Sequence, residues 1–274
     1  MKSRILYRKT VRPASPRALL RSSAKRLAAL LLLPLILCGC LLPGAGRAEL
    51  PVYERERWHP TAPVPREGVR KIACIGDSIT WGFGVLVPDM RTDLTYPALL
   101  ERLLGDGYQV LNYGMSGRTL LAEGDAPYAS EAFTALSLAS GAEAFLILLG
   151  TNDSKLRNWH GSLFQQELEA FVRAYRDLPQ RPRILLATPP KAFPLKETGL
   201  EMYGIRDEII RNEIVPMVRE TAEKLNVTLV DLYVCTESHP EWFPDGIHPN
   251  AEGNQALAEI FASCLRADPP AGSE

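Results

Sequence analysis

Four short stretches of the chain carry the residue types that acyl transfer through a hydroxyl requires. The first is "KIACIGDSIT" (71–80), in which Ser78 follows a short apolar run and comes directly after Gly76 and Asp77. Gly-Asp-Ser is a good turn sequence, so Ser78 can simply be a turn residue. It can also be a nucleophile at the carboxyl end of a strand, where open α/β sheets bind their ligands. Residues 71–80 alone favour the turn, so the rest of the chain must decide.

A serine nucleophile needs a base, and the chain has four histidines. His248 lies in the polar stretch "FPDGIHPNAEG" (243–253), three residues after Asp245. An aspartate at that position can hydrogen-bond to Nδ1 of the imidazole, fix its tautomer and stabilise the imidazolium formed during catalysis. The competing interpretation of this Asp-Gly pair is a plain turn. The other histidines are His59, His160 and His239.

Acyl transfer also needs hydrogen-bond donors for a developing oxyanion. "NYGMSGRT" offers the backbone N–H of Gly117, where the missing Cβ lets the main chain approach a ligand, and "GTND" offers the side-chain amide of Asn152. Each signal is weak by itself, because glycine turns are common and an Asn after a strand often caps a helix. All four pieces follow a strand or lie in the last loop, and together they favour an esterase.

Short apolar runs alternate with amphipathic segments from residue 70 onward and indicate which elements hold these residues. Strands are predicted at 71–76, 108–114, 142–150, within 181–190 and at 227–233; helices at 96–105, 130–140, 164–178, 206–225 (bent near Pro216) and 250–265. Five strands separated by helices predict one α/β domain, 69–268, with a parallel sheet and helices on both faces. The carboxyl ends of its strands lie along one edge, and the site is expected there.

The four stretches "GDSIT", "NYGMSG", "GTND" and "DGIHP" resemble the four sequence blocks of the SGNH, or GDSL, hydrolases. The resemblance covers roughly residues 70–265. It implies a flavodoxin-like three-layer α/β/α sandwich. It also implies that Ser78 is the nucleophile, His248 the base and Asp245 its partner, with Ser78, Gly117 and Asn152 forming the oxyanion hole. The G-x-S-x-G elbow of ordinary lipases is absent from the chain.

Further polar and aromatic residues near the predicted strand ends are candidates for substrate contacts. They are Trp81, Arg118, Lys155, Trp159 and His160. For each of them, packing or surface roles are equally compatible with the sequence. Asp77 is expected to brace its turn and Asp153 to hold the "GTND" loop.

The stretches "NYGMSGRTLL", "LGTNDSKLRNW" and "RDEIIRNEIVPMV" resemble bacterial carbohydrate O-acetylesterases of the sialate and xylan type. This resemblance implies that the substrate is an acetylated carbohydrate or another small ester. Two alternatives remain open at this point: a lysophospholipase or thioesterase acting on lipids, and a non-catalytic lipoprotein that binds glycans.

The N-terminal segment has the features of an export signal. Residues 1–48 hold ten Lys or Arg and no acidic residue, and "LAALLLLPLILCGC" (27–40) is apolar but too short to span a bilayer comfortably. Its end, "LCGC", resembles a bacterial lipobox, which implies that Cys40 carries the lipid and that the protein is a membrane-anchored lipoprotein facing the periplasm or cell surface. Residues 41–68 then form a tether, and 269–274 a short tail. Cleavage after Ala48 would instead release a periplasmic or secreted protein.

Charge and cysteine content narrow the possible partners. The 21 basic and 32 acidic residues beyond position 48 leave that part of the chain with a net charge of −11, which argues against nucleic acid. No C-x-x-C pair, His/Cys cluster or complete dinucleotide fingerprint is present, so neither a metal nor another cofactor is expected. Cys74 is predicted to lie in the core, while Cys235 and Cys264 could form a disulfide in an oxidising compartment. The oligomeric state is not predicted.

Overall fold

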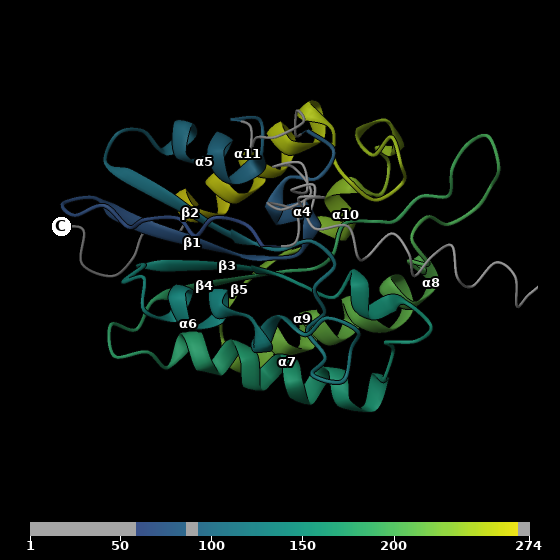
Figure 1. The fold of residues 1–274 in the computed structure, drawn as a ribbon, viewed down its shortest axis with the longest axis horizontal. Coiled ribbons are helices and arrows are strands. Elements are labelled where there is room, and N and C mark those ends of the chain that lie inside the picture. The colour runs from purple at the N-terminus through teal and green to yellow at the C-terminus, as the bar shows by residue number, and fades with distance from the viewer. Residues whose placement is uncertain (1–58, 86–92, 268–274) are drawn as a thin grey trace, which may run out of the picture. The chain divides into compact units, whose positions relative to one another are not determined.

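The protein is built around a five-stranded sheet, seen in a computed structural model that describes residues 59–85 and 93–267 (Figure 1). All neighbouring strands are parallel, in the order β2-β1-β3-β4-β5. Their bounds are β1 Arg70–Gly76, β2 Tyr108–Gly114, β3 Ala144–Leu148, β4 Arg183–Ala187 and β5 Thr228–Val230. The predicted fold class, a parallel α/β sheet covered on both faces, is confirmed.

Helices cover the two faces of the sheet and make three layers. One face carries α4 (Ser78–Trp81), α5 (Tyr96–Leu104) and α11 (Ala251–Ala267), and the other carries α6 (Ala132–Leu138), α7 (Gly161–Arg176) and α9 (Val215–Leu225) (Figure 1). Shorter elements lie in the connections: α8 Asp207–Ile209, a π-helical turn Ile210–Ile214, α10 Leu232–Thr236 and 3₁₀ turns Tyr128–Ser130, Asn152–Ser154 and Pro240–Trp242.

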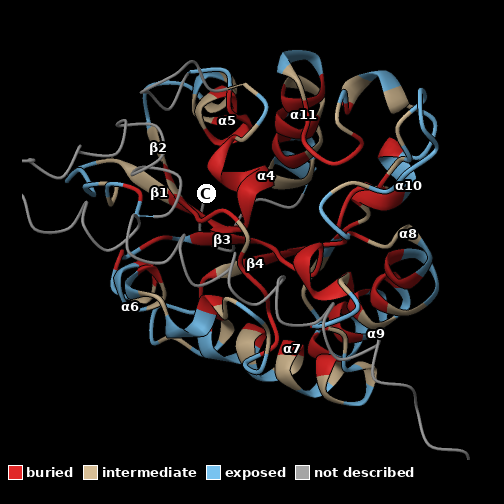
Figure 2. Ribbon diagram, turned by 45° about the vertical axis from the view of Figure 1, so that its right-hand side comes forward, coloured by how far each residue is buried: buried red, intermediate tan, exposed pale blue. Residues whose placement is uncertain are grey.

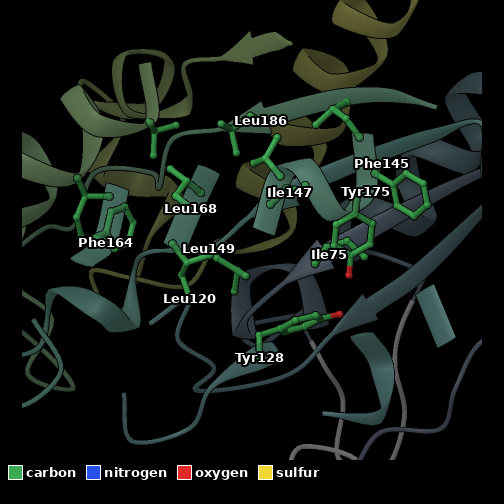
Figure 3. Close-up of a cluster of buried hydrophobic side chains, with 14 of the residues drawn as sticks. Ile75, Leu120, Tyr128, Phe145, Ile147, Leu149, Phe164, Leu168, Tyr175 and Leu186 are labelled. Atoms are coloured by element: carbon green, nitrogen blue, oxygen red, sulfur yellow. The ribbon is translucent and has the colours of Figure 1, made fainter. Parts of the chain in front are cut away.

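Side-chain alternation along each strand divides the core in two. On β1, Ala73 and Ile75 face the layer of α7 and α9, whereas Ile72 and Cys74 face the layer of α5 and α11. Figure 3 shows part of the first cluster, where Tyr175 of α7 approaches Phe145 of β3 with ring centroids 4.9 Å apart. Most residues of β1, β3 and β4 and the sheet-facing sides of the helices are buried, whereas much of the edge strand β2 is half-buried (Figure 2). This core holds the strand ends in fixed positions.

The ends of the first three strands are level with one another. Gly76 of β1 pairs with Gly114 of β2 on one side and with Leu148 of β3 on the other. The chain passes from β1 to β2 and then returns to the far side of β1 for β3, so the connections diverge between β1 and β3. In parallel sheets, such a divergence opens a crevice at the carboxyl edge.

Several predicted elements differ from the observed ones by one to three residues at their ends. Three local differences have a clear physical cause. Ser78 begins a one-turn helix, although the sequence indicated a turn, because the Asp77 carboxylate accepts the N–H of Ile79 at 2.9 Å and caps it. The fifth strand ends at Val230 instead of 233, because Asp231 caps α10 in the same way. Before Pro216, which has no N–H to donate, the predicted helix 206–225 contains a π-helical turn and not only a bend.

The segments predicted as signal, lipid site and tail lie outside the described residues, and so does most of the predicted tether. The last part of the tether is described. There, the N–H of Arg66 donates to Oε1 of Gln109 at 2.6 Å, and Nε2 of Gln109 donates to the Val64 carbonyl at 2.9 Å. Residues 64–66 are therefore attached to β2. No described helix has the length and apolar character needed to cross a membrane.

Candidate active site

Ser78 lies at the start of α4, immediately beyond β1. It is 8% exposed and lines a pocket at the carboxyl edge of the sheet. The preceding residue, Asp77, is fully buried; burial raises the pKa of its carboxyl to about 6, while the hydrogen bond from the Ile79 N–H acts in the opposite direction. Asp77 therefore braces the start of a helix, where the sequence predicted that it would brace a turn, and Ser78 lines the pocket.

His248 reaches Ser78 from the far end of the sequence. Its Nε2 lies 2.9 Å from Oγ of Ser78, and its Nδ1 lies 2.7 Å from Oδ2 of Asp245. The other oxygen of Asp245 accepts the backbone N–H groups of Ile247 at 3.0 Å and His248 at 2.7 Å. These bonds fit the tautomer with the proton on Nδ1, which leaves Nε2 free to accept the Ser78 proton.

Asp245 remains ionised over a wide pH range. Partial burial by itself would raise its pKa, but the hydrogen bond and charge of His248, together with the two backbone N–H donors, hold the pKa at about 2. The tight loop depends on Gly246, which has φ of 82° and leaves no room for a side chain, because a Cβ there would lie 2.0 Å from the Phe193 carbonyl oxygen. An ionised carboxylate is therefore held beside the imidazole.

Two aromatic side chains, which the sequence did not single out, contact the His248 ring. The ring centroid of Phe83 lies 4.3 Å from that of His248, and Tyr203 meets His248 edge-on at 5.3 Å. The Tyr203 hydroxyl also donates to Oδ2 of Asp245 at 3.2 Å. Tyr203 comes from the long connection after β4 and has φ of 57°, and nothing in the local sequence pattern marks it as part of the site.

Gly117 and Asn152 line the same pocket as Ser78. Gly117 has φ of 79°, a conformation that favours glycine, in the loop after β2. Asn152 begins the 3₁₀ turn after β3; its Nδ2 donates to Oδ2 of Asp77 at 3.3 Å and to the Arg118 carbonyl at 3.2 Å. The structure thus brings the three residues predicted for the oxyanion hole to one pocket.

Asp153 connects the two loops that carry Gly117 and Asn152. Its carboxylate accepts the N–H of Leu120 at 3.0 Å and that of Leu121 at 2.8 Å. Burial raises the pKa of Asp153 to about 7, and the two backbone donors limit that rise. Sequence reasoning placed Asp153 as a brace of its own loop, whereas the structure shows that it also holds the loop after β2.

The pocket has a volume of about 260 Å³. It is lined by Ser78, Phe83, Ser116, Gly117, Thr151, Asn152, Lys155, Arg157, Tyr203, Ile205, Ile247 and His248. A cavity of about 270 Å³ lies at the opposite edge of the sheet, beside Lys71 and Ala144, but none of the predicted catalytic or oxyanion-hole residues lines it. The chemistry of the lining, and not its size, therefore identifies the candidate site.

Lys155 is the one residue of the five predicted substrate contacts that lines this pocket in the described part of the chain. Trp81 is buried and does not line the pocket. Arg118 is turned away, since its guanidinium binds Glu131 at 2.7 Å and the Ser116 carbonyl at 2.8 Å. Trp159 donates its indole N–H to Glu213 at 3.2 Å, and His160 is exposed at the start of α7.

Neither a cluster of metal ligands nor a disulfide is found among the described residues. Within residues 59–85 and 93–267, no group of three or more His, Cys, Asp or Glu side chains could hold a metal ion. Cys74 is buried in the core, as predicted, and the thiols of Cys235 and Cys264 are free.

Comparison with known sequences agrees with the four motifs. The sequence profile of the GDSL-like lipase/acylhydrolase family matches residues 74–256. An acetylxylan esterase from Xylanibacter ruminicola is 40% identical over an alignment of 228 positions, which covers 76% of this chain and 46% of that esterase. The chain therefore spans about half the length of this relative.

Solved structures share the fold. A carbohydrate acetylesterase from Sinorhizobium meliloti aligns with a TM-score of 0.58 and 22% identity, covering 72% of this chain and 99% of the other. An aryl esterase from M. smegmatis aligns with a TM-score of 0.59 and 22% identity (73% and 99% covered). A lipase/acylhydrolase from Enterococcus faecalis gives 0.57 and 25% (73% and 96% covered). With the profile match and the 40% identical relative, these findings establish that the chain belongs to the GDSL-like lipase/acylhydrolase family.

Proposed function

We propose that this chain is a carboxylic ester hydrolase in which Ser78 is the nucleophile, His248 the general base and Asp245 the residue that orients it. The observation that carries the proposal is the continuous pair of contacts from Oγ of Ser78 through the imidazole to Asp245, at 2.9 and 2.7 Å. Family membership supports the same class of chemistry.

The reaction follows from these contacts. Ser78 Oγ attacks the ester carbonyl carbon while its proton passes to Nε2 of His248, and Asp245 stabilises the resulting imidazolium. The tetrahedral intermediate then collapses, the C–O bond to the alcohol breaks, and the alcohol leaves with the proton from Nε2. A water molecule then attacks the acyl-enzyme through the same steps, and the acid is released together with free Ser78.

The oxyanion of each tetrahedral intermediate is assigned three donors: the backbone N–H of Ser78, the backbone N–H of Gly117 and Nδ2 of Asn152. The fixed loops support this assignment, because Asp153 ties the two loops together and Asp77 holds the Asn152 amide. Backbone donors that are oriented before reaction stabilise the developing charge without reorganisation. Nδ2 of Asn152 would exchange one of its two long hydrogen bonds, to Asp77 or to the Arg118 carbonyl, for the oxyanion.

The acyl group is proposed to be acetyl and the alcohol a carbohydrate. Of the described residues that line the pocket, only Ile205 and Ile247 are aliphatic, and Phe83 and Tyr203 add aromatic surface. The 40% identical relative is described as an acetylxylan esterase, and a structural neighbour as a carbohydrate acetylesterase. A lysophospholipase or thioesterase would need a longer apolar channel, since each buried CH₂ contributes about 0.8 kcal/mol.

The first test uses p-nitrophenyl esters of increasing chain length and acetylated glycans. We expect kcat/KM to fall from acetate to butyrate and to become very small at octanoate, and acetate to be released from acetylated carbohydrate. An activity that climbs through octanoate would instead support the lipid esterase. A protein that hydrolyses none of these esters would support the non-catalytic glycan-binding alternative.

The second test concerns the proposed catalytic unit. Ser78→Ala or His248→Ala is expected to abolish esterase activity, and the double variant to be scarcely worse than either single variant, because cooperating groups lose their effect together. Strictly additive losses, or normal turnover by Ser78→Ala, would contradict the assignment.

We further propose that the protein is exported and held on a membrane through a lipid on Cys40, in the periplasm or at the cell surface. The support is the basic and apolar N-terminal sequence with its "LCGC" end. Cys40→Ser should move the protein from the membrane to the soluble fraction or leave the precursor unprocessed. A mature chain that begins at Glu49 without lipid would show an ordinary signal peptide.

A further inference from the structure

Lys155 is a partly buried cation in the wall of the pocket that contains Ser78. Its ammonium group makes no salt bridge or hydrogen bond in the part of the chain that the structure describes. Burial lowers the pKa of Lys155, as does the charge of Arg157, while the charges of Asp125, Asp77 and Asp153 act in the opposite direction. Withdrawing an unpaired charge from water is unfavourable, and partly buried cations in proteins are normally paired.

Lys155 and Arg157 place two cationic side chains in the pocket wall, while the carboxylates that act on Lys155 belong to Asp125, Asp77 and Asp153, which do not line the pocket. Arg157 lines the same pocket and forms an ion pair with Asp125, and its side chain remains 70% exposed. No Asp or Glu is among the described residues that line the pocket. The chain beyond residue 48 nevertheless carries a net charge of −11. The pocket thus combines a local attraction for one anionic group with a long-range repulsion of polyanions.

We propose that Lys155, with Arg157 at the rim, forms a subsite for the carboxylate of an acidic sugar that neighbours the acetylated sugar. The preferred substrate is then an acetylated, largely neutral glycan that carries isolated uronic acid groups. This inference rests on the proposed function and specifies its substrate class. The carboxylate takes no part in bond making; it orients the glycan so that the acetyl carbonyl meets Ser78.

A carboxylate fits this subsite better than the charged group of a polyanion. A uronic acid places one negative charge on a neutral chain, so the repulsion from the acidic body is limited to that one charge. A polyphosphate or densely sulfated chain would place many charges against the same surface. A carboxylate subsite can be distinguished from a contribution to the oxyanion, because a group that stabilises the oxyanion would act on every ester alike.

The test compares two substrates that differ only in the carboxylate. One is an acetylated oligosaccharide with a uronic acid side group, and the other is the same compound with that carboxylate converted to an amide. For the unaltered protein, kcat/KM should be on the order of tenfold higher for the acid, mainly through KM, as expected for a hydrogen bond to a charged group. This preference should weaken as NaCl is added.

Lys155→Met should bring the ratio of the two kcat/KM values close to one. The matched control is Lys224→Met, which removes the same charge from the C-terminal end of α9, where Lys224 pairs with Glu169 at 2.6 Å. The control should keep the preference of the unaltered protein. Circular dichroism and thermal unfolding would establish that both variants are folded.

Equal kcat/KM for the acid and the amide in the unaltered protein would overturn the subsite, as would a Lys155→Met variant that keeps the preference. An equal loss of kcat on both substrates would assign Lys155 to the oxyanion instead. Inhibition by inorganic phosphate but not by free glucuronate, at matched ionic strength, would overturn the carboxylate assignment. Ser78-dependent hydrolysis of p-nitrophenyl acetate is measured in parallel. If one of these contrary results is found while that hydrolysis persists, only this inference fails. If the hydrolysis is absent, the proposed function itself fails.

Discussion

Tyr203 donates its hydroxyl to Oδ2 of Asp245 at 3.2 Å, and the same carboxylate oxygen lies 2.7 Å from Nδ1 of His248. The loop after β4 therefore contributes a hydrogen bond to the carboxylate that Asp245 presents to His248. The Tyr203 ring also packs edge-on against the imidazole. Tyr203 thus holds both members of the pair, although it is 47% exposed.

Tyr203→Phe removes only the hydroxyl and is expected to lower kcat a few-fold. Exposure weakens the lost bond below the range of about 1.5–3 kcal/mol for buried hydrogen bonds to charged groups. Tyr203→Ala should cost more, because the ring contact with His248 is lost as well. Steady-state kinetics with p-nitrophenyl acetate measures both effects. A Phe variant as impaired as the Ala variant would mean that the hydroxyl, and not the ring, positions His248.

Asn152→Ala is expected to reduce kcat by about 10²–10³ with little change in KM, because an oxyanion donor acts in the transition state. The side chain makes only two long hydrogen bonds, to Asp77 and the Arg118 carbonyl, so the melting temperature should change little. Unchanged turnover would remove Asn152 from the oxyanion hole.

Gly114→Ala should displace the helix that carries Ser78. A Cβ at this position would lie 2.2 Å from the Trp81 backbone nitrogen and 2.6 Å from the Thr80 carbonyl carbon, both of which belong to α4. Overpacking against fixed backbone costs about 1–3 kcal/mol. We expect a lower melting temperature and a fall of kcat by more than an order of magnitude as the contact between Ser78 and His248 lengthens.

Gly107→Ala is the matched control for that substitution, because a Cβ on Gly107 meets no atom within 4 Å. It should leave both the melting temperature and kcat close to those of the unaltered protein. A Gly114 variant that behaves like the Gly107 control would show that α4 can move without loss of the site.

Asp153 should make the stability of the fold depend on pH. Its pKa is raised to about 7 in the folded protein, above the ordinary value of 3.8, so between these pH values the folded state keeps a proton that the unfolded chain has released. The free energy of unfolding therefore decreases as pH rises from about 4 to 7, and Asp77 contributes in the same direction up to about pH 6. Asp245 acts oppositely: its contribution is present above its ordinary pKa and is lost as pH falls towards 2.

Urea unfolding of the Asp153→Asn variant between pH 4 and 7 would measure this effect. The variant should show a shallower decrease of the unfolding free energy over that range, because the titrating group is gone. It should also turn over more slowly, since an amide presents only one acceptor oxygen to the N–H groups of Leu120 and Leu121. An unchanged slope would assign the pH dependence to other groups.

The sequence by itself determined the elements and the four motifs, because both depend on local order. Apolar periodicity depends on the geometry of strand and helix, so β2 was predicted at its observed bounds and the parallel sheet followed from the alternation of strands and helices. Asp245 and His248 are three residues apart, and their hydrogen bond could be foreseen from that spacing alone.

The ends of the elements and the one-turn helices were harder to predict from the sequence. Whether β5 stops at Val230 depends on a cap at Asp231, and whether α4 forms depends on the Asp77 carboxylate turning back to the Ile79 N–H. A single side-chain bond decides each of these cases, and composition carries only a weak signal for it.

Only the tertiary structure decided which loop side chains reach the pocket. Ser78 and His248 are 170 residues apart and meet because β1 lies between β2 and β3 and the last loop returns to that edge. Arg118 follows Gly117 directly, yet Glu131 draws it away, whereas Tyr203 enters the site from a distant connection. The direction of a loop side chain is set by partners remote in sequence, so residue type and spacing could identify the reacting groups but not the full set of residues around them.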